Sequence, residues 1–184
     1  MNTAFLTGEI FRRQDLITIV TYLSDLHKNS LRELLEKERH IHFIGVGGIG
    51  MSAIAAILAS RGFSVSGSDI KNSDLLKSLS SKGVEIFCQQ SSANIVEVLK
   101  FKKDQPLIVI STAIPSNNPE FKAALEANAE ICHRSDVLAT LMKNQPSIAV
   151  AGSHGKTTTS TLITTMLAVT NQNPTAIIGG LVPH

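Results

Sequence analysis

Two glycine-rich segments carry residue types that bind phosphate groups. The first, Gly45-Val46-Gly47-Gly48-Ile49-Gly50, has glycines at positions 45, 47 and 50, the spacing of a turn from a strand into a helix. There the first glycine allows a tight turn, the second lets the backbone approach a pyrophosphate, and the third lets the helix pack close to the strand. Backbone N–H groups and the positive end of the helix dipole would bind the phosphates. Asp69, at the end of the next predicted strand, could then accept hydrogen bonds from a ribose hydroxyl.

This first pattern does not identify the nucleotide, because NAD, FAD and nucleotide sugars all present a pyrophosphate. An NAD-dependent oxidoreductase is therefore one alternative. Another is a packing turn without a ligand, in which Asp69 caps the following helix.

The second glycine segment follows the apolar run 148–151 and opens a helical pattern. It is shorter than the usual P-loop, since Val150 stands where that pattern has its first glycine. Its N–H groups would surround phosphates, Lys156 would contact the β- and γ-phosphates, and the Thr157 hydroxyl would bind Mg²⁺. The alternative is a helix N-terminus with threonine caps and a solvated lysine. The residues predicted to bind nucleotide phosphates are Gly152, Ser153, His154, Gly155, Lys156, Thr157 and Thr158. His154 could contact substrate or face solvent, and we assign it no catalytic role.

The elements that position the first loop alternate regularly from residue 40 onward. Apolar runs predict strands over 41–44, 63–66, 84–87, 107–110 and 129–132. Helical spacing predicts helices over 51–61, 74–81, 93–101, 119–127 and 135–143, the last capped by Ser135 or Asp136. This alternation favours an α/β fold, a Rossmann-like doubly wound parallel sheet covered by helices on both faces, in a domain spanning 40–143.

Two further regions flank this domain. After a linker at 143–146, a strand over 147–151, a helix over 156–170 and a strand over 175–178 would begin a P-loop α/β domain. Residues 147–184 are too few to complete that domain, so we expect it to be truncated. Residues 1–39 read as a helical appendage, with helices over 15–26 and after a capping box at Ser30 and Glu33.

Composition excludes several classes of protein. The 184 residues include 17 Lys and Arg and 15 Asp and Glu, and a net charge of +2 gives no footprint for nucleic acid. No apolar run is long enough for a membrane span, and no secretory signal is evident, which predicts a cytoplasmic protein. Cys88 and Cys132 are expected to be semi-buried reduced thiols, without a disulfide framework or a metal-ligand spacing.

The combination of loops resembles the Mur ligases of peptidoglycan synthesis, in particular those that act on UDP-N-acetylmuramate and L-alanine. The segments that carry the resemblance are His40–Ser52, Val65–Asp69, Ser111–Pro115, Arg134, Leu138, Ala151–Thr159, Pro174-Thr175 and Gly179-Gly180. Ser153 stands where the family commonly has Thr, and Ser135-Asp136 where it has Ala-Glu. The resemblance implies a first domain that binds the UDP sugar, a second that binds ATP and Mg²⁺, and a third that contributes to the amino-acid site.

The resemblance also implies a reaction and a set of site residues. ATP phosphorylates the lactyl carboxylate of UDP-N-acetylmuramate, and the amine of L-alanine attacks the acyl phosphate, releasing phosphate. Lys156 and Thr157 would be catalytic, with Thr157 a metal ligand. The implied UDP-sugar residues are Gly45, Gly47, Gly48, Gly50, Ser68, Asp69, Ser111, Thr112 and Ala113.

The resemblance covers residues 40–184, and the alanine site and remaining Mg²⁺ ligands should lie mostly outside this chain. We therefore expect an N-terminal portion that is inactive alone. The second loop argues against the oxidoreductase, which needs no Gly-Lys-Thr loop. A non-catalytic nucleotide-binding module remains a further alternative.

Overall fold

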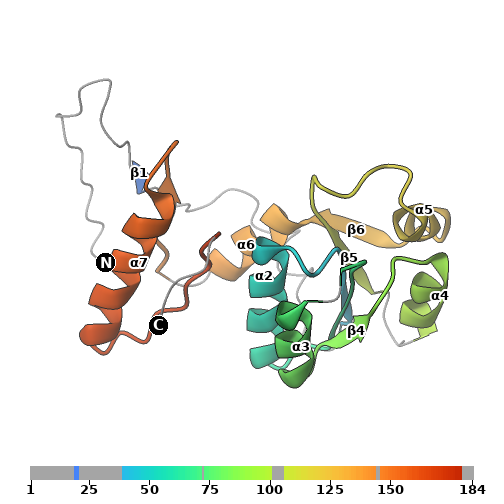
Figure 1. The fold of residues 1–184 in the computed structure, drawn as a ribbon, viewed down its shortest axis with the longest axis horizontal. Coiled ribbons are helices and arrows are strands. Elements are labelled where there is room, and N and C mark those ends of the chain that lie inside the picture. Colours follow the sequence, from blue (N-terminus) through green and yellow to red (C-terminus); the bar gives the residue numbers. More distant parts are fainter. Residues whose placement is uncertain (1–18, 21–38, 72, 101–105, 144–145, 180–184) are drawn as a thin grey trace. The chain divides into compact units, whose positions relative to one another are not determined.

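A computed structural model describes residues 19–20, 39–71, 73–100, 106–143 and 146–179 of the chain (Figure 1). These residues belong to two compact units. The larger comprises Leu23–Ser147 and Ile177–Leu181, and the smaller comprises Met1–Tyr22, Ile148–Ala176 and Val182–His184.

The larger unit contains a parallel sheet of five strands in the order β4-β3-β2-β5-β6. The strands are β2 (Ile41–Ile44), β3 (Val65–Ser68), β4 (Glu85–Phe87), β5 (Leu107–Ile110) and β6 (Glu130–His133). Ile41 is in register with Val65 of β3 on one side and with Leu107 of β5 on the other. The chain thus winds outward from β2 in both directions, which confirms the predicted doubly wound α/β sheet.

Helices cover both faces of this sheet. The helices are α2 (Ile49–Ser60), α3 (Asp74–Ser81), α4 (Ser92–Lys100), α5 (Pro119–Glu126) and α6 (Arg134–Met142). Helices α2, α3 and α6 share one apolar cluster with Phe43, whereas α4 and α5 pack with Ile44 in a second cluster. Figure 1 shows α2 between α3 and α6, and α4 beside α5. All four residues of β2 are buried, as expected for a central parallel strand.

The start of α6 differs from the prediction. We expected Ser135 or Asp136 to cap this helix, but His133 is the N-cap: its Nδ1 accepts a hydrogen bond from the N–H of Ser135 at 3.3 Å. The Asp136 carboxylate accepts from the N–H of His133 at 3.0 Å and completes a capping box. An imidazole nitrogen can thus serve as the acceptor that Ser or Asp usually provides.

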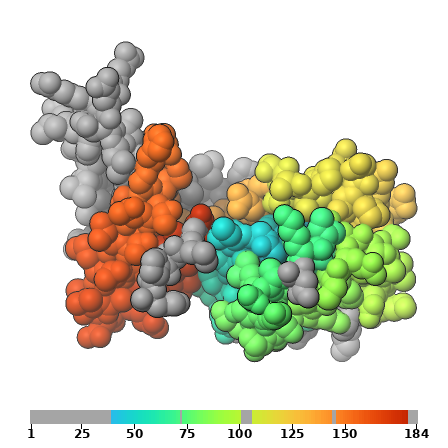
Figure 2. Space-filling model, viewed as in Figure 1, coloured from blue at the N-terminus to red at the C-terminus, as the bar shows by residue number. Residues whose placement is uncertain are grey.

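The smaller unit contains β7 (Val150–Ala151), α7 (Lys156–Val169) and β1 (Ile19–Val20), which pairs antiparallel with β7. The helix predicted over 15–26 is therefore wrong at Ile19 and Val20; its other residues and the helix after Ser30 lie outside the described residues. The strand predicted over 175–178 is also wrong, because residues 172–178 form no regular secondary structure. Helix α7 has no buried residue, and Figure 2 shows the orange surface that its side chains form.

Other predicted boundaries shift by one or two residues, with β3 beginning at Val65 and β6 ending at His133. The strand predicted over 147–151 is shortened to Val150–Ala151. Among the described residues, no helix combines the length and apolar character needed to cross a membrane.

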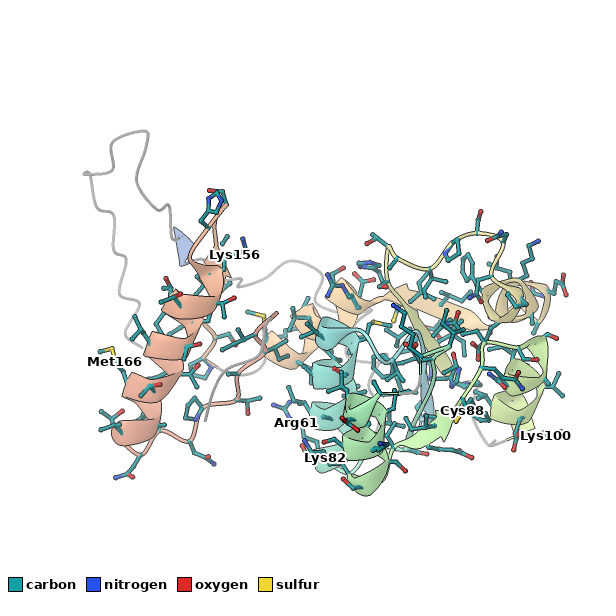
Figure 3. All side chains as sticks on the ribbon, in the orientation of Figure 1. Arg61, Lys82, Cys88, Lys100, Lys156 and Met166 are labelled. Atoms are coloured by element: carbon teal, nitrogen blue, oxygen red, sulfur yellow. The ribbon has the colours of Figure 1, made fainter. Side chains whose placement is uncertain are left out.

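The two cysteines differ in exposure and should differ in reactivity. Cys88 is exposed rather than semi-buried as predicted (Figure 3), whereas Cys132 is partly buried in β6. Burial, with the nearby carboxylates of Asp136 and Glu130, raises the pKa of the Cys132 thiol to about 12. Because the thiolate is the nucleophile, we expect only one thiol to react quickly with Ellman's reagent at pH 8, and the second only after denaturation. Two fast thiols in the folded chain would contradict this assignment.

Candidate nucleotide-binding site

The predicted UDP-sugar residues lie at the carboxyl edge of the parallel sheet, where the loops that follow its strands meet. The glycine loop follows β2, Asp69 follows β3, and residues 111–117 follow β5. This is the edge at which open α/β sheets bind ligands, next to the point where the strand order reverses between β2 and β5.

Gly45 makes the tight turn that the sequence predicted. Its φ is +80°, a conformation that favours glycine, and its N–H and that of Val46 donate to the carbonyl of Ser68 at 2.8 and 2.9 Å. A Cβ on Gly45 would also lie 2.9 Å from Cδ1 of Ile114. The turn is therefore held against the end of β3 and packs beneath the loop that follows β5.

Gly47 makes room for Asp69. Its N–H donates to Oδ2 of Asp69 at 2.8 Å, while Oδ1 accepts from the N–H of Lys71 at 2.9 Å. A Cβ on Gly47 would lie 2.6 Å from that Oδ2. The need for glycine thus arises inside the protein, and the approach of a pyrophosphate to Gly47 stays a prediction. Through its hydrogen bond to Gly47, Asp69 connects the loop to the end of β3.

Gly50 has a different role from the one predicted. We expected it to let α2 pack close to the strand, but the only side chain that a Cβ on Gly50 would meet within 4 Å is that of Arg134, whose Nη1 it would overlap. Arg134 was not predicted as a site residue, because only the fold brings the start of α6 beside the start of α2.

Gly48, the N-cap of α2, contrasts with these positions. Its φ of −69° and ψ of 140° suit any residue, and the nearest atoms to an added Cβ lie 3.7 and 3.9 Å away. No contact within the described chain therefore requires glycine at position 48.

These contacts predict opposite outcomes for two neighbouring substitutions. Gly47→Ala should displace the Asp69 carboxylate and lower the free energy of unfolding by about 1–3 kcal/mol, through overpacking and a lost charge-assisted hydrogen bond. Gly48→Ala should lower it by no more than about 0.5–1 kcal/mol, since no atom lies in the way and only the poorer N-cap preference of alanine acts. Urea unfolding of the two variants beside the parent chain measures both. Equal midpoints for the two alanine variants would contradict the role given to Asp69.

A buried polar network supports the end of β3. Glu120 is fully buried at the start of α5, and its carboxylate accepts hydrogen bonds from Oγ of Ser68 and from Nδ2 of Asn94 at 3.0 Å. Nε2 of His42, also fully buried, lies 2.9 Å from Oε1 of the same carboxylate. Ser68, which the sequence predicted as a ligand contact, is therefore turned into the core and supports the loop through its carbonyl and hydroxyl.

The network continues along the strands from His42. A carboxylate only accepts, so His42 donates from Nε2, and its Nδ1 lies 2.7 Å from Oγ of Ser66. That hydroxyl is also 2.7 Å from Nε2 of His40. This network was not predicted, although the sequence carries a visible signal: His42 lies within the buried strand β2, and His40 just before it.

The loop after β5 supplies the remaining predicted residues. Ser111 is half-buried and its carbonyl accepts from the N–H of Ile114 at 3.0 Å, while Thr112 and Ala113 are exposed. Asn118 begins α5 and donates from Nδ2 to Oε1 of Gln90 at 2.6 Å, which ties this loop to the segment after β4. The exposed residues 112 and 113 are therefore open to a ligand above the sheet edge.

The second glycine loop lies in the smaller unit. Gly152 has a φ of 158°, and Gly155 has a φ of +76° and forms the N-cap of α7 without a side-chain hydrogen bond. Nζ of Lys156 folds back over the loop, donating to the carbonyls of Gly152 and of Ser153, the latter at 3.1 Å (Figure 3). The loop thus has the backbone shape and the cation that a phosphate site needs.

The other predicted residues of this loop are exposed, namely Ser153, His154, Thr157 and Thr158. The Thr157 hydroxyl could serve as one Mg²⁺ ligand. Within the described ranges, no cluster of three or more His, Cys, Asp or Glu side chains could hold a metal ion. The fit to the phosphates of ATP is therefore good, whereas the loop 152–158 offers Mg²⁺ hydroxyl oxygens but no carboxylate.

Comparison with known proteins places the chain in one family. The model of the "Mur ligase family, catalytic domain" matches residues 40–146. The UDP-N-acetylmuramate–L-alanine ligase of Prochlorococcus marinus (strain MIT 9313) is 58% identical over 154 residues, covering 84% of this chain and 32% of the relative. The ligase of the same name from Synechococcus sp. (strain CC9311) is 55% identical over 153 residues, covering 83% of this chain and 32% of the relative.

Comparison with solved structures also finds ligases that act on UDP-N-acetylmuramate by name. The UDP-N-acetylmuramate-alanine ligase of Thermotoga maritima superimposes with a TM-score of 0.69 at 32% identity, covering 78% of this chain and 32% of that one. The UDP-N-acetylmuramate:L-alanyl-gamma-D-glutamyl-meso-diaminopimelate ligase of Neisseria meningitides gives a TM-score of 0.64 at 27% identity, covering 78% and 43% of the two chains. The chain thus spans about a third of the length of the curated relatives that it matches.

Proposed function

The chain belongs to the Mur ligase family, and from this premise we propose that it serves the ATP-dependent ligation of L-alanine to UDP-N-acetylmuramate, a step in making peptidoglycan precursors. Its part in that reaction is to bind the UDP sugar at the loop Gly45–Gly50 and the phosphates of ATP at the loop Gly152–Thr158. The location we propose is the cytoplasm, where ATP is available.

The observation that carries this proposal is the glycine loop at the carboxyl edge of the doubly wound sheet. Gly45 turns the chain into the start of α2, and this helix has neither a side-chain cap nor an acidic residue in its first turn. Free N–H groups there suit a diphosphate. The names of the two solved relatives contain different amine substrates, but both contain UDP-N-acetylmuramate. This favours the loop as the site of the shared substrate.

The proposed domain organisation assigns one of the two ligands to each domain. Residues 40–143 would form the UDP-sugar domain, and residues 147–184 would begin the ATP domain. The main segment of the larger compact unit ends at Ser147, which supports a domain boundary near residue 147. Residues 1–39 receive no role in the reaction.

ATP supplies the phosphoryl group that converts the lactyl carboxylate, a poor electrophile, into an acyl phosphate with a good leaving group. Lys156 would place its ammonium against the β- and γ-phosphates, exchanging the carbonyls of Gly152 and Ser153 for phosphate oxygens. Backbone N–H groups at the start of α7 would hold the remaining phosphate oxygens. Thr157 is the residue we propose for contact with Mg²⁺. The amine of L-alanine then attacks the acyl carbon, and phosphate leaves.

A chimera tests the proposal at the level of activity. Residues 40–179 of this chain would replace the matching segment of the P. marinus (strain MIT 9313) relative, and ADP release would be measured with and without L-alanine and UDP-N-acetylmuramate. We expect ADP release that requires both substrates. A folded chimera that releases no ADP, beside an active parent ligase, would contradict the proposal.

A further inference from the structure

The start of α6 brings an arginine to the glycine loop. Arg134 is the first residue of α6, and its Nη1 occupies the space that a side chain on Gly50 would need. Gly50 itself is the second residue of α2, in the first turn, where backbone N–H groups have no partner within the helix. A guanidinium thus lies beside the free N–H groups of a second helix.

This placement is unfavourable in the absence of an anion. The N-terminus of a helix carries a partial positive charge, so a cation at the first position of α6 and beside the first turn of α2 is repelled by both. Arg134 is exposed, and no hydrogen bond or ion pair of its guanidinium is found within the described ranges.

Asp69 and Asp136 keep their negative charge, but among the described residues neither carboxylate forms an ion pair with Arg134. Asp136 accepts from the N–H of His133, and Asp69 accepts from the N–H groups of Gly47 and Lys71. A negatively charged group outside the described protein is what the arrangement lacks.

Resting on the proposed function, we infer that Arg134 contacts the diphosphate of the bound UDP sugar, and that Gly50 is glycine in order to admit its guanidinium. Arg134 has the planar fork of donors that binds two phosphate oxygens at once. The diphosphate would lie between this fork and the N–H groups of α2. Arg134 is a binding residue of the UDP sugar, next to the glycines, and takes no part in the transfer chemistry.

A double-mutant cycle tests the inference, because the second residue acts through the first. UDP would be titrated calorimetrically into the 184-residue chain and into the variants Arg134→Gln, Gly50→Ala and the double variant. We expect Arg134→Gln to weaken UDP binding about 10-fold to 100-fold, as for a lost hydrogen bond between charged groups. Gly50→Ala should weaken it to a similar extent by displacing the guanidinium, and in the Arg134→Gln background it should have little further effect.

Two controls separate this effect from a general loss of structure or charge. Arg61→Gln removes an exposed arginine at the C-cap of α2, the far end of the helix that contains Gly50 (Figure 3), and should leave UDP binding within about twofold. Uridine, which has no phosphate, should compete equally well in the parent and in Arg134→Gln. Far-UV circular dichroism confirms that each variant folds.

Three results would overturn the inference. The first is equal UDP affinity of Arg134→Gln and Arg61→Gln. The second is a Gly50→Ala effect that is undiminished in the Arg134→Gln background, which would make the two residues independent. The third is a parent chain that does not bind UDP, which would overturn the proposed function as well; the first two leave that function standing.

Discussion

Replacing Glu120 with alanine should lower the free energy of unfolding by about 3–5 kcal/mol, because three buried donors lose their shared acceptor at about 1–3 kcal/mol each. The carboxylate is fully buried and accepts hydrogen bonds from His42, Ser68 and Asn94. Without it these three groups stay buried with unmet hydrogen bonds. For a chain of this size the loss corresponds to a fall in Tm of about 6–20 °C.

Thermal unfolding of Glu120→Ala and of Glu126→Ala measures this effect. Glu126 ends the same helix α5 but is exposed, so its replacement should change Tm by less than about 2 °C. Equal Tm values for the two variants would refute the structural role of Glu120. The loss of stability in Glu120→Ala should also affect the nucleotide site, since the carbonyl of Ser68 accepts the hydrogen bonds that hold the turn at Gly45 and Val46.

Replacing Lys156 with alanine in the chimeric ligase should lower kcat for ligation by at least about 10³-fold. Phosphoryl transfer depends on positioned positive charge, and Lys156 is the cation at the second glycine loop. Its carbonyl partners, Gly152 and Ser153, belong to an exposed part of the loop where water can replace the ammonium, so the fold should be little affected.

Single-turnover ADP release is the measurement, with Lys122→Ala as the matched control. Lys122 is exposed on α5, and its loss should leave kcat within about twofold. Circular dichroism of both variants shows whether they fold. Unimpaired ligation by Lys156→Ala would contradict the ATP-binding role of this loop and favour a nucleotide-binding module without catalysis.

The sheet of the larger unit could be predicted because its strands are short apolar runs, separated by helices with clear apolar stripes. Ile41–Ile44 and Leu107–Ile110 begin and end as predicted. The failures were short segments whose state depends on distant partners. Ile19 and Val20 form a strand because Val150 and Ala151 lie opposite, and no local pattern in 15–26 reveals that pairing.

The candidate site, like the fold, could be predicted from the sequence only in part. The position of the glycine loop, its tight turn at Gly45 and the nearness of Asp69 followed from spacing alone. The reasons for glycine at 47 and 50 did not, because they depend on Asp69 and Arg134, which only the fold brings close. Glu120 was missed for the same reason: it lies 78 residues from His42 along the chain.

Direct titration with UDP-N-acetylmuramate tests the central claim, that the loop Gly45–Gly50 binds a UDP sugar. The same glycine pattern is shared by NAD-dependent oxidoreductases, so NADH is the matched competitor. We predict saturable binding of UDP-N-acetylmuramate to the 184-residue chain, displaced by UDP and unaffected by NADH. Saturable binding of NADH, with none of UDP-N-acetylmuramate, would contradict the account.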